Sequence, residues 1–294
     1  MPTTGADRTK DRHIATQPGG SGGALKYQLP QIRLLEAASF RSFPSTTTRY
    51  DGTWAIRMTA GHPAKRLNSV NPLDPDDCLD LENRIALAGD RFRSFGRPLM
   101  FRLTPLAPDA LRVMLQEKGW QSFEESLVMA ADLSAETAGD AGDQLPMKDI
   151  GRWVDGYIEL SQDNPELKPG FSEIIGATEP ETGLFMRYSE DGARLASVVR
   201  CVRDLRLAGI FDLVTAPAET RKGHARGVLK TALRWAYHTG ARRAWLQVVA
   251  ENAAARRLYE QLGFEEIYRY SYWKPPAETP REKPAEAAGE AGKG

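Results

Sequence analysis

The feature that most constrains the fold of this chain is an internal similarity between two αβ segments far apart in the sequence. Residues 111–120 parallel residues 255–264, and both segments end in a glycine followed by an aromatic residue. Pro72 and Pro217 stand at nearly the same separation. Such similarity predicts a tandem of two related folded halves. The alternative is a chance similarity of two unrelated αβ units.

Length and composition divide the chain further. The 294 residues indicate about two domains, and 41% hydrophobic with 27% charged residues allows a sizeable core. Polar composition rich in glycine or proline predicts disordered tails over residues 1–26 and 275–294. A third such stretch predicts a linker over residues 134–146. The two folded halves therefore extend over residues 27–133 and 147–274.

The second half has the clearer pattern of helices and strands. Apolar residues at every third or fourth position between Gly223 and His238 predict a helix over 225–237 that stops before Gly240. Because this helix stands between predicted strands at 207–215 and 243–250, those strands should be parallel neighbours. The other predicted elements of this half are helices at 150–161, 165–175 and 252–262 and strands at 183–188, 193–202 and 264–273.

The first half repeats much of this order. Its predicted elements are helices at 31–40, 75–95 and 108–119 and strands at 53–59, 66–72, 99–103 and 121–131. The predicted fold class is α/β, with two similar units of sheet covered by helices.

The loop before the helix at 225–237 has the composition of an anion-binding site. Gly223 and Ala225 allow the backbone to approach a ligand closely, and Arg221 and Lys222 add positive charge. The free N–H groups and the positive dipole end of a helix start favour a phosphate group there. A dinucleotide fingerprint does not fit, because its second glycine and its following acid are missing. A plain surface turn before an amphipathic helix is the alternative.

Two motifs together resemble the acetyl-CoA site of the GNAT N-acetyltransferase superfamily. The loop resembles the GNAT pattern Q/R-x-x-G-x-G/A, although Thr220 replaces the usual Gln or Arg. The GNAT run N-x-x-A-x-x-L-Y-x-x-x-G-F is matched by Asn252, Ala255, Leu258, Tyr259, Gly263 and Phe264. This run looks most like that of the ribosomal-protein alanine N-acetyltransferases. The resemblance covers residues 149–273 and implies tandem GNAT-like folds, each a mostly antiparallel mixed sheet with a central parallel pair.

The resemblance implies a site for acetyl-CoA as cosubstrate. The pyrophosphate would lie on the loop formed by Thr220, Arg221, Lys222, Gly223, His224 and Ala225. The pantetheine would bind as a pseudo-strand to the backbone of Leu213, Val214 and Thr215. It would also contact the Asn252 amide. One strand N–H would polarise the thioester carbonyl.

The resemblance also implies two catalytic residues. Tyr259 would protonate the departing thiolate, since a phenol of pKa near 10 suits a thiolate of pKa near 8.5. Asp212 stands where the family often carries a strand acid, and we expect it to act as base directly or through water. The alternatives are a core aromatic for Tyr259 and a strand-surface carboxylate for Asp212.

Two further expectations concern side-chain placement. Asn252 and Tyr259 stand about two turns apart in the predicted helix, so they should share a face. His224 should direct its side chain to solvent or phosphate and take no part in catalysis.

The first half lacks the corresponding groups. Opposite the loop stand residues 75–80, which contain three acids and no glycine. Leu115 stands opposite Tyr259. We therefore predict a degenerate GNAT-like half that packs against the working half and walls the acceptor pocket. For residues 65–71 two roles stay open, acceptor binding or a strand-to-turn segment with capped polar groups.

Charge and residue usage argue against other classes of function. Lys and Arg number 39, as do Asp and Glu, so the basic excess of a nucleic-acid binder is missing. Two cysteines fit a reducing compartment, and four scattered histidines show no metal-ligand spacing. No apolar run approaches the ~20 residues of a membrane span, and no secretory signal is recognisable, so we predict a cytoplasmic protein without a metal.

These observations lead to one main expectation of function. The chain should move an acetyl group from acetyl-CoA to a primary amine, on a small molecule, peptide or protein, by direct attack in a ternary complex. A non-catalytic acyl-CoA-binding or regulatory protein is the alternative, although a mere binder has no need of Tyr259. A scaffold without ligand is a third, which the intact loop argues against. We expect an amine-bearing acceptor as partner, no nucleic acid or membrane, and a monomer or homodimer.

Overall fold

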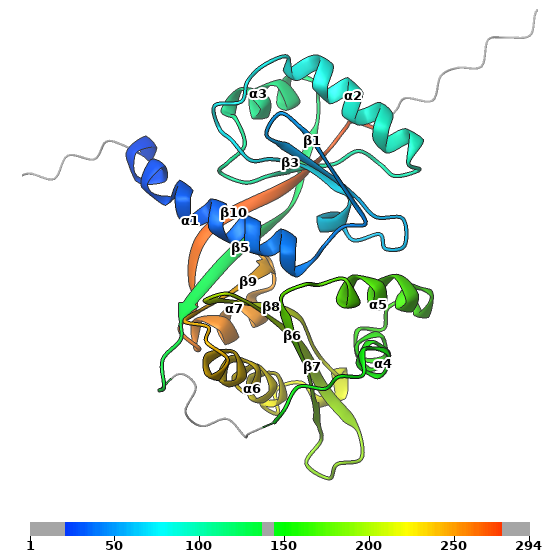
Figure 1. Cartoon of the computed structure of the whole chain (residues 1–294), viewed down its shortest axis with the longest axis vertical. Helices are drawn as coiled ribbons and strands as arrows, with labels where there is room; N and C mark the ends of the chain where they lie inside the picture. The colour runs from blue at the N-terminus through cyan, green and yellow to red at the C-terminus, as the bar shows by residue number, and fades with distance from the viewer. Residues whose placement is uncertain (1–20, 137–143, 278–294) are drawn as a thin grey trace, which may run out of the picture.

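The computed structural model describes residues 21–136 and 144–277, with side chains from residue 28 onward (Figure 1). Residues 1–20 and 278–294 of the predicted tails, and 137–143 of the predicted linker, lie outside the described residues. The first helix, α1 (Ser21–Ser42), begins within the segment assigned to the N-terminal tail and is longer than the helix expected at 31–40.

The strands form one mixed sheet that runs through both halves of the described chain. Across the sheet they are β1 (Thr47–Asp51), β2 (Trp54–Met58), β3 (Ser69–Pro72), β4 (Phe101–Leu103), β10 (Glu265–Lys274), β5 (Gln121–Asp132), β9 (Arg243–Val249), β8 (Leu207–Thr215), β7 (Leu195–Asp204) and β6 (Glu181–Tyr188). The helices are α1, α2 (Leu81–Ser94), α3 (Asp109–Glu117), α4 (Ile150–Ser161), α5 (Lys168–Gly176), α6 (His224–His238) and α7 (Ala253–Glu260), with short 3₁₀ turns η1 (Lys65–Leu67), η2 (Pro165–Leu167) and η3 (Pro217–Glu219).

The last strand of each half lies in the sheet of the other half. β10 comes from the end of the chain, yet it pairs antiparallel with β4 and β5 of the first half. β5 in turn pairs antiparallel with β9 of the second half. Figure 1 shows β10 and β5 as two long strands that cross the middle of the molecule together. The two halves are therefore joined through backbone hydrogen bonds of their own strands.

Each half contains one parallel strand pair joined by a helix, as the tandem prediction requires. β8 and β9 are parallel with α6 between them, and β3 and β4 are parallel with α2 between them. The β8–β9 pairing stops at Ile210 and Leu246, although β8 continues to Thr215. A register shift against β7 accompanies Asp212, which has a φ of 55°. This bulge bends β8, and beyond Ile210 the two parallel strands are no longer paired.

Helices cover both faces of the second half's sheet. Successive residues of a strand point to opposite faces. Val198 and Val202 accordingly pack in the core with α4 and α5, whereas Val199 and Cys201 pack in the core with α6. The predicted apolar stripe of α6 is confirmed, since it is buried at Val228, Leu229, Ala232, Leu233 and Ala236. The first half has a separate core under α2 and α3.

Three elements of the first half differ from the prediction. β1 was not expected, because its exposed polar residues lack a strand-like apolar alternation. α2 begins at Leu81 rather than at 75. The preceding turn is held instead by Asp77, whose carboxylate accepts hydrogen bonds from the Thr53 N–H at 3.0 Å and from Arg84 at 2.8 Å. The start of the strand expected at 66–72 forms the 3₁₀ turn η1.

Candidate active site

The predicted anion loop follows β8 and the 3₁₀ turn η3, and it leads into α6. α6 begins at His224, so the N–H groups of its first turn have no carbonyl partner within the helix. The backbone turns sharply before it, with a φ of 62° at Arg221 and 84° at Gly223. A side chain at Gly223 would meet no atom within 4 Å, so the left-handed conformation, and not a lack of space, favours glycine here.

A buried carboxylate, Glu219, holds this loop in place. Its side chain is 4% exposed and accepts a hydrogen bond from Lys222 Nζ at 3.1 Å. His224 Nε2 and an Arg194 nitrogen each lie 3.2 Å from its carboxylate oxygens. The Lys222 hydrogen bond lowers the pKa of Glu219, so the carboxylate stays ionised. Glu219 therefore supplies a brace for the loop that the sequence analysis missed.

The expectation that the His224 side chain faces solvent is wrong, and its placement toward a phosphate stays a prediction. The imidazole is buried, and its Nδ1 accepts from Arg187 Nε at 3.4 Å. An accepting Nδ1 leaves the proton on Nε2, which points to Glu219. The side chain thus ties the first residue of α6 to the turn before it, while its backbone N–H still belongs to the loop. Thr220 donates to the carbonyl of Pro217 at 3.0 Å and braces the same turn.

Asn252 lies at the start of α7 and not inside it. Its Oδ1 accepts from the Ala255 N–H at 3.1 Å, which makes it the N-cap of a helix that begins at Ala253. The expectation that Asn252 and Tyr259 lie two turns apart within one helix is corrected accordingly. Because the cap uses Oδ1, the side-chain NH₂ group remains as a donor toward solvent or ligand.

Tyr259 lies near the end of α7 and is 8% exposed. Its ring packs against Phe264 with centroids 6.0 Å apart. Burial raises the pKa of the Tyr259 phenol to about 12, which keeps it protonated at neutral pH. The same shift makes complete proton transfer to a thiolate of pKa near 8.5 less favourable than from an unperturbed tyrosine. Tyr259 is not among the residues that line the cavity described below.

Asp212 projects from the β8 bulge, and its charge is balanced by a buried arginine. Its Oδ2 accepts from Arg200 Nε at 2.7 Å. Arg200 is fully buried, donates to the Ser42 carbonyl at 3.0 Å, and lies over the ring of Phe43. Among the described residues, Asp212 Oδ1 has no hydrogen-bond partner. One oxygen of this carboxylate is thus fixed and the other is free to meet a ligand.

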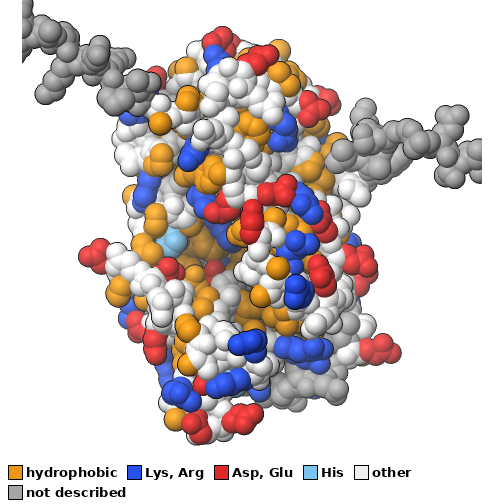
Figure 2. Space-filling view, turned by 180° about the vertical axis from the view of Figure 1, so that it is seen from behind, with side chains coloured by type: hydrophobic (Ala, Val, Ile, Leu, Met, Phe, Trp, Pro, Cys, Tyr) orange, Lys and Arg blue, Asp and Glu red, His pale blue; other side chains and the backbone are white. Residues whose placement is uncertain are grey.

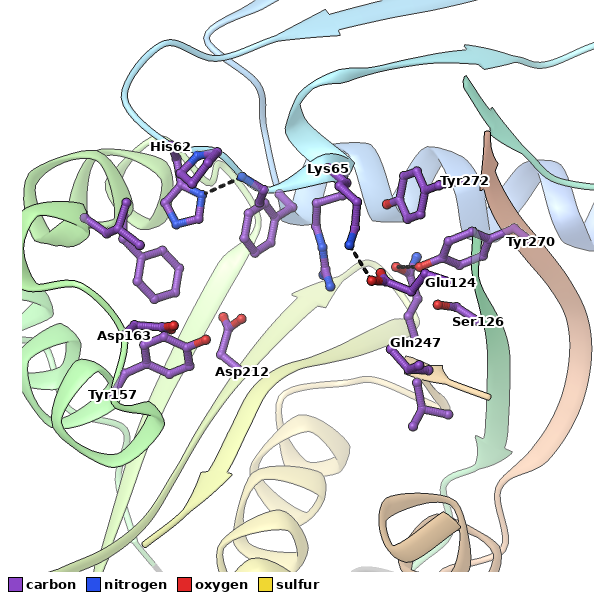
Figure 3. Close-up of a pocket in the computed structure, with 18 of the residues that line it drawn as sticks. His62, Lys65, Glu124, Ser126, Tyr157, Asp163, Asp212, Gln247, Tyr270 and Tyr272 are labelled. Atoms are coloured by element: carbon purple, nitrogen blue, oxygen red, sulfur yellow. Dashed lines mark hydrogen bonds and ion pairs between the residues drawn. The ribbon is translucent and has the colours of Figure 1, made fainter. Parts of the chain in front are cut away.

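A cavity of about 400 Å³ opens between the two halves next to Asp212 (Figure 3). Val248 and Val249 of β9 line it, so it reaches the unpaired ends of the parallel strands. Figure 2 shows a hollow with hydrophobic surface inside and charged side chains around it. The first half contributes Phe43, His62, Lys65, Arg66, Glu124 and Ser126, and the second half with β10 contributes Tyr157, Asp163, Phe171, Gln247, Tyr270 and Tyr272. Its volume is typical of a small-molecule site.

Residues 65–71 contain both structural residues and residues that line the cavity. Asn68 is a structural residue, because its Oδ1 accepts from the Thr59 N–H at 2.9 Å and its Nδ2 donates to the His62 carbonyl at 2.8 Å. Lys65 and Arg66, in contrast, line the cavity. Sequence alone did not separate the two sets, since only the tertiary contacts of Asn68 reveal that its amide is fully used.

His62 of the first half also reaches the cavity. Burial lowers the pKa of the imidazole, so it is neutral near pH 7. Its Nδ1 accepts from the Ala64 N–H at 3.2 Å, which leaves Nε2 carrying the proton. His62 can therefore donate a hydrogen bond to a ligand, but it is not placed to accept a proton from one.

Residues 75–80 of the first half, which stand opposite the anion loop in the internal alignment, lack the features of that loop. Residues 75–80 form a turn in which Arg84, by hydrogen bonding, lowers the pKa of Asp77 to about 2. This turn has negative charge where the second half has Lys222 and Gly223. Leu115, opposite Tyr259, is a fully buried core residue. That the first half has no acyltransferase site of its own stays a prediction, and these contacts are consistent with it.

A parallel strand pair that separates beside a helix-start loop defines an acyltransferase of the GNAT superfamily. The chain belongs to the family described as "Probable histone acetyltransferase Rv0428c C-terminal", whose model matches residues 30–273. It is 26% identical over 252 residues to "Uncharacterized N-acetyltransferase YobR" of Bacillus subtilis, covering 83% of this chain and 98% of that protein. It is 31% identical over 98 residues to the ribosomal protein bS18-alanine N-acetyltransferase of Escherichia coli K12, covering 33% of this chain and 66% of that protein.

Two solved structures share the fold at low sequence identity. A GCN5-related N-acetyltransferase from Kribbella flavida has a TM-score of 0.60 and 16% identity, covering 87% of this chain and 97% of that chain. A tandem GNAT protein from the clavulanic acid biosynthesis pathway has a TM-score of 0.55 and 14% identity, covering 86% of this chain and 95% of that chain. These likenesses confirm the predicted tandem GNAT-like architecture as a fold.

No helix within 21–136 or 144–277 is long and apolar enough to cross a bilayer. In the same parts of the chain, no group of three or more His, Cys, Asp or Glu residues is arranged to hold a metal ion.

Proposed function

We propose that this protein transfers an acetyl group from acetyl-CoA to a primary amine by direct attack within a ternary complex. One observation carries the proposal: the strands β8 and β9 part at Ile210, with an anion loop after β8 and a cavity beside the gap. A thioester lying between the strands would have its phosphates at the loop and its acetyl group at the cavity. The acceptor would enter from the cavity side.

The loop and the gap divide the binding of acetyl-CoA between them. The pyrophosphate would accept hydrogen bonds from the first N–H groups of α6, near Arg221 and Lys222. The pantetheine amides would pair with the backbone of β8 from Leu213 to Thr215, which β9 leaves unpaired. The Asn252 NH₂ group would meet the same chain from the start of α7. One free N–H of β8 would also hold the thioester carbonyl oxygen.

The chemical step needs a base and a stabiliser for the leaving sulfur. An alkyl amine of pKa near 10.4 is largely protonated at pH 7, so it must lose a proton before attack. Asp212 would take this proton, directly or through water. The neutral nitrogen then bonds to the carbonyl carbon, the C–S bond breaks, and Tyr259 donates its phenol hydrogen to the sulfur. The second proton that the nitrogen loses on becoming an amide would return through water to the Tyr259 phenolate, and the proton on Asp212 would pass to solvent. With a raised pKa, Tyr259 would stabilise the sulfur first by hydrogen bonding and transfer its proton as CoA departs.

The activity is tested by following thiol release from acetyl-CoA in the presence of single amines, diamines, amino acids and short peptides. The proposal expects release that depends on the amine and an acetylated amine of matching amount by mass spectrometry. Binding of acetyl-CoA without turnover of any amine would favour the non-catalytic acyl-CoA-binding alternative. Failure to bind acetyl-CoA would contradict the proposal altogether.

A further inference from the structure

Some of the charged side chains on the first-half wall and the β8 side of the cavity are paired within the protein, whereas Arg66 of the first half and Asp163 of the second half are in no ion pair among the described residues. Lys65 forms an ion pair with Glu124 (Figure 3). Asp212 forms one with Arg200, which lies outside the cavity lining. Arg66 lines the same cavity and is half-buried. In residues 21–136 and 144–277, no carboxylate lies within ion-pair distance of its guanidinium. A guanidinium at a cavity surface that has no counter-charge in the protein is available to an anionic group of a ligand.

The Arg66 guanidinium is nevertheless held in place. Its central carbon lies 4.9 Å from the centre of the Phe43 ring, and the Arg200 guanidinium lies 4.7 Å from the same ring. Stacking on an aromatic face fixes the plane of a guanidinium and leaves its N–H edge free for a planar anion. Arg66 is thus oriented by packing, not by a hydrogen bond that a ligand would have to break.

A second arginine strengthens the positive field on this wall. Arg57 lies behind Arg66 and donates to its backbone carbonyl at 2.8 Å. Its other hydrogen-bond partners are the Phe43 carbonyl and the Ser45 hydroxyl, and no carboxylate among the described residues forms an ion pair with it, although the charge of Glu36 acts on it from a distance. Burial, with a contribution from the charge of Arg102, lowers the pKa of Arg57 to about 10, which still leaves it charged at neutral pH.

The wall of the cavity that the second half forms has carboxylates where the first-half wall has arginines. Figure 3 shows Asp163 beside the ring of Tyr157, with Asp212 nearby. Asp163 is exposed to the cavity mouth, and Asp212 keeps one oxygen without a hydrogen-bond partner among the described residues. The ring centroids of Phe171 and Tyr157 lie 5.0 Å apart, so Phe171 adds aromatic surface to this wall. Carboxylates next to aromatic faces suit an ammonium group.

We infer that the acceptor is a small molecule that carries a carboxylate together with its amine, and that Arg66 binds this carboxylate. The inference rests on the proposed function, since it identifies the second substrate of that reaction. Arg66 would hold the carboxylate with two parallel hydrogen bonds, while the amine faces Asp212 and the gap between β8 and β9. Phe43, Tyr157 and Phe171 would enclose an apolar or aromatic body. A cavity of about 400 Å³ fits a molecule of amino-acid size.

The test compares acceptors that differ only in the carboxylate. L-Phenylalanine is compared with 2-phenylethylamine, L-tyrosine with tyramine, and L-lysine with cadaverine, by thiol release at saturating acetyl-CoA. A charge-assisted, bidentate contact predicts a kcat/KM roughly ten- to a hundredfold higher for the carboxylate member of at least one pair. A peptide amide that begins with alanine serves as a polypeptide-like acceptor. Equal or better use of the decarboxylated amines or of the peptide would overturn the inference and leave the acetyltransferase proposal standing.

Variants at position 66 connect the preference to this side chain. Arg66→Gln should remove most of the preference within a pair by raising the KM of the carboxylate member, with little change for the matching amine. Arg66→Lys keeps the charge but loses the planar guanidinium. Its preference for the carboxylate member should therefore lie between that of the wild type and that of Arg66→Gln. Arg49→Gln removes an exposed arginine that does not line the cavity and should behave as wild type. A preference that survives Arg66→Gln would contradict the role of Arg66.

A binding measurement separates the two proposals if no probe is turned over. The carboxylate probes are titrated calorimetrically into the protein with and without CoA. Binding that Arg66→Gln abolishes would support the inference even if acetyl transfer failed. The inference would be overturned if no carboxylate probe bound while acetyl-CoA did. Thermal melts of each variant confirm that the fold is intact, because the acetyl-CoA-induced shift should be the same in all.

Discussion

Arg200 and Asp212 form an ion pair at 2.7 Å at the point where β8 bulges away from β9. Arg200 is completely buried, and the Asp212 side chain is 11% exposed. The arginine has no other carboxylate partner among the described residues and uses the Ser42 carbonyl for a further bond. Asp212 therefore has a structural role in the bulge in addition to the proposed role as a base.

The first prediction separates these two roles. Asp212→Asn leaves Arg200 buried without a counter-charge, which should cost about 3–5 kcal/mol of unfolding free energy. The double variant Asp212→Asn with Arg200→Met removes the isolated charge and should recover much of that loss, as measured by denaturant unfolding. If Asp212 is the base, kcat/KM should stay low in the double variant. An unchanged kcat/KM from pH 6 to 9 in either variant would eliminate Asp212 as base.

Tyr259→Phe tests the proposed stabiliser of the leaving sulfur. We expect kcat to fall roughly 10²-fold, while the Kd of acetyl-CoA stays within about twofold of wild type. Because burial raises the pKa of Tyr259 to about 12, wild-type kcat should not decline from loss of this proton below about pH 11. Tyr50→Phe, at an exposed tyrosine, is the matched control. Equal loss of binding and turnover would mean that Tyr259 only maintains the fold.

Glu219→Ala tests the brace of the anion loop. The substitution leaves His224 and Lys222 without their shared carboxylate, so the loop should lose order and the Kd of acetyl-CoA should rise by about tenfold. Glu219 also places a negative charge near the pyrophosphate, and its removal alone would lower the Kd. A tighter Kd in the variant would show that repulsion outweighs bracing. Glu251→Ala, an exposed acid before α7, is the control for isothermal titration.

The acid dependence of stability should depend on Asp77. Hydrogen bonding to Arg84 lowers its pKa from 3.8 to about 2. A carboxylate with a lowered folded-state pKa stabilises the fold above its unfolded pKa, and that stability is lost as the pH falls through the folded value. Asp77→Asn should therefore lower the Tm at pH 7 and flatten its decline between about pH 4 and 2. Asp76→Asn, at an exposed neighbour, should leave the curve unchanged.

The exchanged strands predict one cooperative unfolding transition. β10 cannot leave the sheet without exposing the edges of both β4 and β5. β5 is in turn hydrogen-bonded to β9 of the second half. Differential scanning calorimetry should give one transition whose calorimetric and van't Hoff enthalpies agree. Two separate transitions would show that the two halves unfold independently despite the shared sheet.

Local sequence patterns predicted the elements well where one periodicity dominates. The predicted bounds of α4 and β8 match the structure, because each has an uninterrupted pattern bounded by clear turn residues. Gly240 marked the end of α6 to within one residue, whereas α7 ends at Glu260, two residues before the predicted end at 262. The identity of a strand's neighbour is a long-range property, so the sequence predicted β10 as a strand but not its place between β4 and β5.

The candidate site divides in the same way. The loop with Gly223 and the position of Tyr259 could be predicted, because short motifs carry them. Arg66 and Glu219 could not, since their significance depends on partners that the fold alone brings together, or on the lack of them. His224 is buried because it packs against Glu219 in the folded chain. The periodicity of a helix does not predict such a contact.

The central claim is that the loop before α6 and the gap between β8 and β9 bind acetyl-CoA. The most direct measurement is a thermal melt of the wild type and of Gly223→Val with acetyl-CoA, CoA or NAD. At about 100 times Kd, ligand binding should add about 2.7 kcal/mol and raise the Tm by roughly 2–4 °C. The account predicts this shift for both CoA species in the wild type, none for NAD, and a smaller shift in Gly223→Val, whose side chain strains the φ of 84°. No shift with either CoA species would contradict it.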